Sequence, residues 1–167
     1  MENNNKIKGM ENNFKIENCL GFIANRFVKE FQRSFDTKLS QYGITCAQFC
    51  VLVKLFEDDG LIQTKLAERL YIENPTLVRT LDRLESSDLI ERRRDSDDRR
   101  TYHIYLLPKA KGLKDIIEKA GAEMNKKVTE SFAPQEIDYV RNSLIQLWKN
   151  LAIKEYDKKT DHDQLTL

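Results

Sequence analysis

The 167-residue sequence has few of the residues that mark catalytic or metal-binding sites. Its two histidines, His103 and His162, stand in different parts of the chain, so no catalytic triad or general acid–base pair is apparent. The three cysteines lack further ligands at the spacing of a zinc site. We therefore expect neither an enzyme nor a bound metal or other cofactor.

The sequence also has no long hydrophobic run. We therefore expect no transmembrane span and no secretory signal, and hence a cytoplasmic protein. A hydrophobic content of 40% over 167 residues suits one domain, or one core with helical extensions. Folding of such a chain buries roughly 70% of the surface of its unfolded state.

An excess of positive charge is missing as well. The chain carries 28 Lys and Arg against 27 Asp and Glu, which gives a net charge of +1. Between Ile62 and Lys109, ten basic residues stand against nine acidic ones. Binding to a nucleic acid therefore cannot depend on a general basic surface, and would need basic groups sorted onto one face.

The stretch from Ile62 to Leu107 predicts two helices joined by a short turn, followed by a charged hairpin. The second helix is expected to begin at Asn74-Pro75, because Asn caps free amides and proline at the first helical position has no amide to leave unpaired. Its apolar residues recur at helical spacing and predict a buried face: Leu77, Leu81 and Leu84.

A neighbouring face of this second helix carries hydrogen-bond donors. They are Thr76, Arg79, Thr80 and Arg83. Arginine can bond two acceptors of guanine in the major groove, and threonine can contact a phosphate or a thymine methyl group. This is the chemistry of a recognition helix, although a solvated amphipathic helix is the alternative interpretation.

The hairpin changes the period of the pattern from 3.6 to two. Residues 89–94 predict a strand, 95–98 a polar turn and 101–106 a returning strand. Five arginines lie between Arg92 and Arg100, so the tip can reach phosphates or a narrow minor groove. Asp98 is expected to hold the Arg100 side chain through a bidentate pair. The alternative is a salt-bridged, exposed hairpin, because the same segment holds four acidic residues.

Three segments resemble the MarR family of bacterial transcription regulators: LYIENPTLVRTLDRLE at 70–85, DLIERR at 88–93 and DSDDRR at 95–100. The NPTLVRTLDRLE segment is most similar to the SlyA branch, and the resemblance covers about residues 16–151. It implies a mostly α fold with a small antiparallel β-wing, in which a winged helix-turn-helix is flanked by N- and C-terminal dimerisation helices. It also implies a homodimer on a pseudo-palindromic operator in double-stranded DNA.

The resemblance assigns roles by position. Arg79 would contact base edges, supported by Thr76, Thr80 and Arg83. Arg100 would be the wing arginine that enters the minor groove, with Asp98 as its orienting partner and Arg99 as a phosphate contact. One departure from the family lies after the wing, where Leu107-Pro108 replaces a common Thr cap and Ala110 a common Gly. This departure weakens the predicted start of the next helix.

Helices flank the predicted winged helix on both sides. A first helix is expected over about 17–40, and a capping box of Thr45 and Gln48 opens a second one in which Phe49, Val53 and Phe56 should face inward. The helix before the recognition helix should span Gln63 to Leu70. After the wing, two long helices are expected over 110–132 and 134–151.

Apolar seams on these outer helices predict a dimer interface, because a winged-helix core does not need them. A self-contained helical hairpin is the alternative. The residues assigned to the interface are Leu20, Ile23, Phe27, Ile137, Val140, Leu144, Leu147, Trp148 and Leu151.

The cysteines allow a minority hypothesis of redox sensing. Cys46 and Cys50 have i, i+4 spacing and could bind a metal or form a redox pair, but we interpret them as buried small apolar residues. In the thiol-sensing OhrR branch the reactive cysteine lies near the start of the first helix, where Gly21 aligns. Cys19 stands two residues earlier, a rotation of roughly 200° on a helix. Peroxide sensing at Cys19 is therefore the less favoured alternative.

The sequence thus predicts five segments: a mobile arm at 1–15, a first dimerisation helix at 16–44, a winged helix-turn-helix at 45–109, C-terminal dimerisation helices at 110–153 and a charged tail at 154–167. We expect a nucleoid-associated, homodimeric transcriptional repressor that a small aromatic or phenolic anion releases from DNA. The alternatives are a thiol-based redox-sensing regulator of the same family and a winged-helix module that binds only proteins.

Overall fold

The computed structural model describes residues 15–160, and side chains as far as Leu151. The predicted mobile arm, apart from residue 15, and the end of the charged tail with His162 lie outside the described residues. The described residues fall into two compact units that divide between Ala122 and Glu123. The first unit holds the complete three-stranded sheet and the helices packed on it, so it is the unit that matters for the site.

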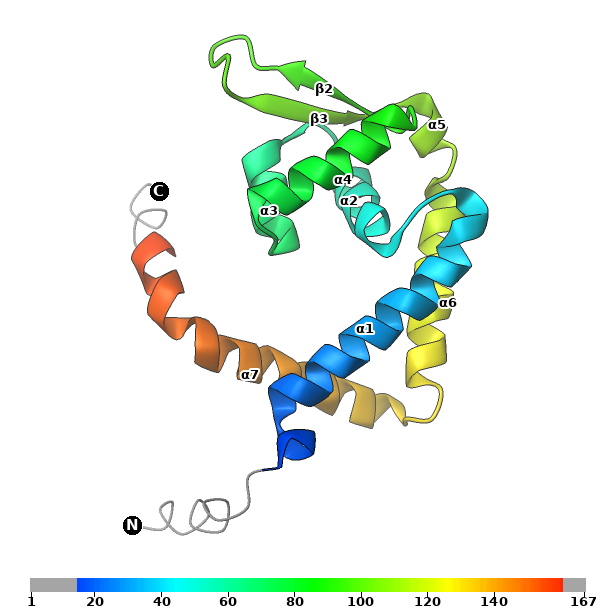
Figure 1. Cartoon of the computed structure of the whole chain (residues 1–167), viewed down its shortest axis with the longest axis vertical. Coiled ribbons are helices and arrows are strands. Elements are labelled where there is room, and N and C mark those ends of the chain that lie inside the picture. The colour runs from blue at the N-terminus through cyan, green and yellow to red at the C-terminus, as the bar shows by residue number, and fades with distance from the viewer. Residues whose placement is uncertain (1–14, 161–167) are drawn as a thin grey trace. The chain divides into compact units, whose positions relative to one another are not determined.

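The chain is mostly helical, and three short strands between residues 61 and 106 form one small sheet (Figure 1). This arrangement confirms the predicted fold class. The elements are η1 (Ile16–Asn18), α1 (Leu20–Leu39), η2 (Ser40–Tyr42), α2 (Cys46–Glu57), β1 (Leu61–Ile62), α3 (Gln63–Leu70), α4 (Asn74–Ser86), β2 (Ile90–Arg94), β3 (Tyr102–Leu106), α5 (Pro108–Lys111), α6 (Lys114–Thr129) and α7 (Pro134–Thr160). Helix α7 therefore extends past its predicted end at Leu151. Within the described residues no single helix is long and apolar enough to cross a bilayer. Only the segment 20–42 and α2 together, bent by 71° at their break, reach that length and composition.

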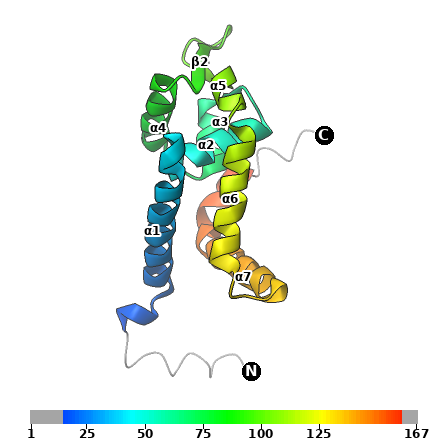
Figure 2. The ribbon, with the colours of Figure 1, turned by 90° about the vertical axis from the view of Figure 1, so that its right-hand side faces the viewer.

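Helix α1 belongs to the winged-helix core by its C-terminal half. Phe35 and Leu39 are buried, and the Phe35 ring meets that of Phe49 on α2 with centroids 4.7 Å apart. Towards the N-terminus the same stripe becomes half-buried at Phe31 and 51% exposed at Phe27. Figure 2 shows these first turns of α1 at the end of the unit opposite the wing. The C-terminal half of α1 therefore shares a hydrophobic core with α2.

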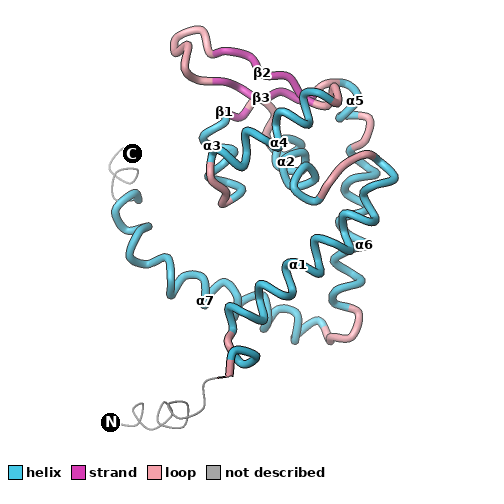
Figure 3. The backbone as a smooth tube through the Cα atoms, in the orientation of Figure 1, coloured by secondary structure: helices cyan, strands magenta, loops and turns pink. Residues whose placement is uncertain are grey.

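The sheet has the order β1-β3-β2, with antiparallel neighbours (Figure 3). Strands β2 and β3 form the predicted hairpin, in register with Ile90 opposite Leu106. Strand β1 pairs Leu61 with Ile104 and was not predicted, because a strand of two residues is too short to show an alternating pattern. Its pairing fixes the loop after α2 to the centre of the hairpin.

The apolar stripe of α4 is buried as predicted, and Leu77, Leu81 and Leu84 have no exposed surface. In α2 the prediction was wrong in detail. The fully buried residues are Val51, Leu52 and Leu55, whereas Phe49, Val53 and Phe56 are half-buried. The Phe49 ring packs closely against α6, where a Cβ atom at Gly121 would lie 2.8 Å from it.

Helix ends agree with the sequence in part. The capping box of α2 is confirmed. The backbone amide of Gln48 donates to the Thr45 hydroxyl at 3.3 Å, and the backbone amide of Thr45 donates to the side-chain oxygen of Gln48 at 2.9 Å. Asn74 does not cap α4: it is the first helical residue and follows Glu73, whose side chain makes no capping hydrogen bond. The helix expected from Ala110 begins earlier, at Pro108, and is divided into α5 and α6.

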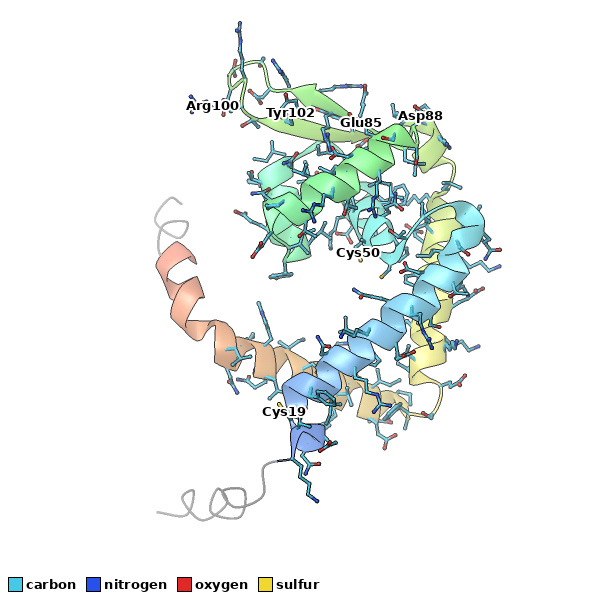
Figure 4. All side chains as sticks on the ribbon, in the orientation of Figure 1. Cys19, Cys50, Glu85, Asp88, Arg100 and Tyr102 are labelled. Carbon is cyan, nitrogen blue, oxygen red and sulfur yellow. The ribbon has the colours of Figure 1, made fainter. Side chains whose placement is uncertain are left out.

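Arg92 on β2 joins the wing to the recognition helix α4. Its guanidinium donates to Asp82 at 2.6 Å, to Glu85 at 3.2 Å and to the carbonyl oxygen of Val78 at 3.3 Å. Glu85, which Figure 4 labels on α4, also accepts the backbone amide of Arg92 at 3.2 Å. The Arg92 side chain is only 19% exposed, so these contacts are shielded from water on the arginine side.

We expect Arg92→Met to lower the free energy of unfolding by about 1–2 kcal/mol. The substitution keeps the aliphatic part of the side chain but removes the charge-assisted hydrogen bonds to α4, and the partly exposed carboxylates reduce the cost. Urea unfolding monitored by circular dichroism measures it. The matched control is Arg93→Met, because Arg93 is 60% exposed and pairs with Glu91 on its own strand. Equal losses for both variants would contradict the role of Arg92.

Candidate nucleic-acid interface

The exposed face of α4 carries three of the four predicted contact residues. Thr76, Arg79 and Arg83 are exposed, and among the described residues the two arginines have no ion-pair partner. The acidic residues of the same helix point elsewhere, because Asp82 and Glu85 bind Arg92 of the wing. Positive and negative groups are thus separated around α4, as the near-neutral charge balance of this region requires.

Thr80 is a correction to the predicted site. It is buried, at 8% exposure, and its hydroxyl donates to the carbonyl oxygen of Thr76 at 3.2 Å. Thr80 follows Leu77 by three residues and precedes Leu84 by four, so it belongs to the buried stripe of α4 rather than to its donor face. The hydrogen-bond donor of its hydroxyl is used within the helix, so Thr80 is not available to a ligand on the outer surface.

The five wing arginines have different surroundings. Arg92 is held against α4, as described above. Arg93 pairs with Glu91 and lies over the Tyr105 ring, 4.4 Å from its centroid. Arg94 donates to the Tyr102 hydroxyl at 3.0 Å, and its guanidinium lies 5.6 Å from the centroid of the same ring. These three side chains are therefore engaged with the protein itself.

The other two wing arginines, Arg99 and Arg100, lie in the loop between β2 and β3. Both are exposed, and in the part of the chain that the structure describes neither guanidinium has an ion-pair partner. Figure 4 shows Arg100 at the tip of the hairpin, away from α5. The tip thus presents two positive charges that no described carboxylate neutralises directly.

Asp98 organises this tip differently from the prediction. Its carboxylate accepts the backbone amide of Arg100 at 2.9 Å and the Thr101 hydroxyl at 2.9 Å, instead of binding the Arg100 guanidinium. A short aspartate side chain reaches the amide two residues later more readily than a long, mobile guanidinium. Asp98 therefore fixes the backbone from which Arg100 projects and leaves the Arg100 side chain free to bind a ligand.

His103 on β3 contacts two loops at the base of the hairpin tip. One ring nitrogen lies 2.8 Å from the Asp95 carboxylate and the other 2.9 Å from the carbonyl oxygen of Gly60. Both neighbours are acceptors, and only the doubly protonated imidazolium can donate to both. The hydrogen bond to Asp95 and then that to Gly60 raise the pKa of His103 above its usual value. The two contacts connect the wing to the loop between α2 and β1.

Asp95 and Gly60 are both adapted to this arrangement. The hydrogen bond from His103, with those from the amides of Asp98 and Asp97, lowers the pKa of Asp95 to about 2. Gly60 has a φ of +85°, and a Cβ atom there would lie 2.6 Å from the Tyr105 ring. Glycine is therefore the residue that this position accepts without strain.

The His103–Asp95 pair predicts a pH-dependent wing. The pair stabilises the fold fully between about pH 4 and pH 6.5, where unfolded Asp95 is ionised and unfolded His103 is protonated. The contribution falls as pH rises through the raised pKa of His103, and also as pH falls towards 2. NMR titration of His103 should give a pKa above 6.5 that Asp95→Asn lowers. The control Asp97→Asn removes the same charge without touching His103, and an equal shift in both variants would contradict the pairing.

Some of these site residues were not recognised from the sequence. The sequence contains a partial indication of the role of Arg92, because Asp82 and Glu85 stand at i, i+3 on the helix before the strand. The pattern does not indicate which of the five wing arginines these two acids bind. His103 was recognised only as a residue of the wing strand. Its partner Gly60 is 43 positions away, and a pairing over that distance has no local pattern.

The winged helix is the part of this chain that a family model matches. The model of the MarR family matches residues 44–102, which extend from just before α2 to the first residue of β3. The chain is 31% identical to the uncharacterised HTH-type transcriptional regulator YsmB of Bacillus subtilis, over 88% of this chain and 98% of YsmB. It is 35% identical to the organic hydroperoxide resistance transcriptional regulator of the same organism, over 58% of this chain and 68% of the relative. A match to TtmR of Methylorubrum extorquens, at 32% identity, covers 64% of this chain and about half (54%) of TtmR.

Solved structures show the same fold. The Staphylococcus aureus MepR–DNA complex aligns with a TM-score of 0.74 at 25% identity, over 79% of this chain and 98% of MepR. These relatives are transcriptional regulators, not enzymes, and no finding selects the SlyA branch among them. Because the family model matches the winged helix, and because YsmB and MepR are each matched over 98% of their length, this chain belongs to the MarR family of DNA-binding transcriptional regulators.

Proposed function

We propose that this protein is a homodimeric repressor that binds a pseudo-palindromic operator through α4 and the tip of the wing. One observation supports this proposal above the others. The positive groups Arg79, Arg83, Arg99 and Arg100 are exposed, whereas the acids of α4 are occupied by Arg92. In each subunit Arg79 would contact base edges in the major groove, and Arg100 would enter the adjacent minor groove.

The small number of free basic groups makes two copies of the site necessary. Affinity for DNA depends strongly on how many phosphates a protein neutralises, and a subunit of net charge +1 has few basic groups to spare. A two-fold dimer doubles these contacts and sets two recognition helices about 34–36 Å apart, one turn of the double helix. The pseudo-palindrome follows from this symmetry.

Exposed apolar residues on α1 support the dimer. Leu20, Ile23 and Phe27 are 62%, 49% and 51% exposed, although they continue the stripe that is buried at Phe35. The ring centroids of Phe27 and Phe31 lie 6.0 Å apart, so the stripe is continuous. A contiguous apolar face that is covered only at one end is typical of a surface that another chain completes.

Helix α7 carries a second uncovered face. Val140, Leu144, Leu147 and Leu151 are between 40% and 86% exposed, and Trp148 is 44% exposed. The remaining predicted interface residue, Ile137, is half-buried. A self-contained helical hairpin would bury this seam, so its exposure favours pairing with a second subunit over that alternative.

The DNA contacts are tested by Arg79→Ala and Arg100→Ala. Each should weaken operator binding by about 1–3 kcal/mol per half-site, and Arg79→Ala should also relax sequence preference, because only base contacts carry sequence information. Footprinting and fluorescence anisotropy on the DNA upstream of the protein's own gene measure both effects. Arg33→Ala is the control, since Arg33 is exposed on α1 and pairs with Glu30. Unchanged affinity in both test variants, or no binding at low salt, would leave the winged helix as a protein-binding module.

The dimer is tested by Leu144→Glu. A carboxylate in the centre of the α7 seam would be buried on association, so we expect a shift from dimer to monomer without loss of helix content. Light scattering after gel filtration and circular dichroism measure the two quantities. Gln146→Glu adds a carboxylate to the same helix at a polar, exposed position and serves as the control. A wild-type chain that runs as a monomer at micromolar concentration would refute the dimer directly.

Release from DNA by a small aromatic or phenolic anion completes the proposal. Its support is the family resemblance, and its mechanism would be a higher affinity of the ligand for the state that does not bind DNA. Repeating the footprint with salicylate tests this. Repeating it with peroxide tests the alternative redox sensor: Cys19 is the half-buried residue that precedes α1, and Cys19→Ser should abolish a response that depends on it.

A further inference from the structure

Two cysteines stand together at the start of α2, outside the proposed DNA-binding surface. Cys46 is the first residue of the helix and Cys50 lies one turn later. Cys46 is half-buried, but Cys50 is exposed, so their interpretation as two buried apolar residues is wrong for Cys50. Figure 4 shows Cys50 on the side of α2 that faces away from the wing.

The two thiols lie one helical turn apart on the same face of α2. The Cys46 thiol forms a hydrogen bond with Cys50, and this bond lowers the pKa of the Cys50 thiol to about 7. The same bond, then burial and the carboxylate of Asp36, raise the pKa of Cys46. Asp36 is fixed beside the pair because it accepts the backbone amide of Cys46 at 2.6 Å. The pair therefore loses its first proton near neutral pH and retains the second on Cys46.

The helix sets the spacing between the two side chains. Residues at i and i+4 have their Cβ atoms about 5–6 Å apart. A disulfide requires about 3.5–4.5 Å between the same atoms, so direct oxidation would have to distort the first turn of α2. That turn is held by the Thr45–Gln48 capping box and by the contact with Asp36. One additional atom between the sulfurs fits the spacing without such a distortion.

We propose that Cys46 and Cys50 form a two-thiol site that binds trivalent arsenicals, with the arsenic atom bridging the two sulfurs. Arsenic that carries one organic substituent needs only two thiolates, and the pair offers two. Zinc is less suited, because structural zinc sites use four ligands. Among the described residues no group of three or more His, Cys, Asp or Glu is arranged to hold a metal ion.

The binding reaction is a condensation without a change of oxidation state. An organoarsenic oxide has one arsenic–oxygen double bond, and the Cys50 thiolate attacks the arsenic atom. The arsenic-bound oxygen takes one proton from water, which replaces the proton that Cys50 has released to the solvent. Cys46 then forms the second arsenic–sulfur bond, and its thiol proton leaves with the resulting hydroxyl group as one water molecule. Soft sulfur ligands favour such thiophilic centres over hard cations. The exposed Cys50 is the first nucleophile, because a thiolate and not a thiol attacks.

The test uses phenylarsine oxide with the native, reduced full chain. Intact-mass spectrometry should show one phenylarsenic group per chain, gained with loss of one water. The adduct should survive an excess of the monothiol glutathione and be removed by the dithiol 2,3-dimercaptopropanol, because only a second dithiol can replace both sulfurs. Cys46→Ser and Cys50→Ser should each lose the glutathione-resistant adduct. Cys19→Ser should retain it.

Several results would overturn the site. They are a resistant adduct in either single variant, dependence on Cys19, an adduct only after denaturation, or peroxide-driven formation of a Cys46–Cys50 disulfide in a chain that does not retain the arsenical. Circular dichroism of Cys46→Ser and Cys50→Ser confirms that they are folded, and Cys50→Ala repeats the measurement without a hydroxyl group. No readout involves DNA, so this inference and the proposed function stand or fall separately.

Discussion

The ion pairs between Arg92 and the acids of α4 are the interaction on which the DNA-binding unit depends. One guanidinium joins the recognition helix to the wing and occupies Asp82 and Glu85. Without it, two carboxylates would stand unpaired on the helix that we propose to contact DNA, and like charges repel. With it, the negative and positive charges of this nearly neutral region are separated. The acids of α4 pair with Arg92 on β2, and arginines that have no ion-pair partner among the described residues lie on the outer face of α4 and at the wing tip.

Acidic side chains also fix the backbone of the wing, because they accept hydrogen bonds from nearby donors. Asp98 accepts the Arg100 amide, and Asp95 accepts two loop amides and the His103 ring. The acids that make the hairpin look nearly neutral in composition are thus largely consumed in building it. Arg99 and Arg100 project from a loop whose backbone is fixed, so little conformational entropy of the backbone would be lost when they bind.

Sequence reasoning worked where burial follows a local period. The bounds of α3 and the buried stripe Leu77, Leu81 and Leu84 follow from the 3.6-residue repeat. It failed for Thr80, which the family position made a contact residue although its spacing places it in that stripe. It also failed for β1, which is too short for a pattern, and for the Gly60–His103 contact, which joins distant positions. For Asp98 the predicted partner, the Arg100 guanidinium, was wrong, because a hydrogen bond to the nearby Arg100 backbone amide competes with a side-chain pair.

The continuous row of phenylalanine rings along α1 has a mechanical consequence. Phe27, Phe31 and Phe35 contact one another in sequence, and Phe35 contacts Phe49 on α2, so the helix is anchored at one end in the core. With 20 residues α1 is a rod about 30 Å long. A tilt of about 5° at the anchored end displaces the free end by about 2–3 Å over that length. Helix α1 thus acts as a lever arm. A small change of its tilt around Phe35 becomes a larger displacement of any chain that is bound at its N-terminal end.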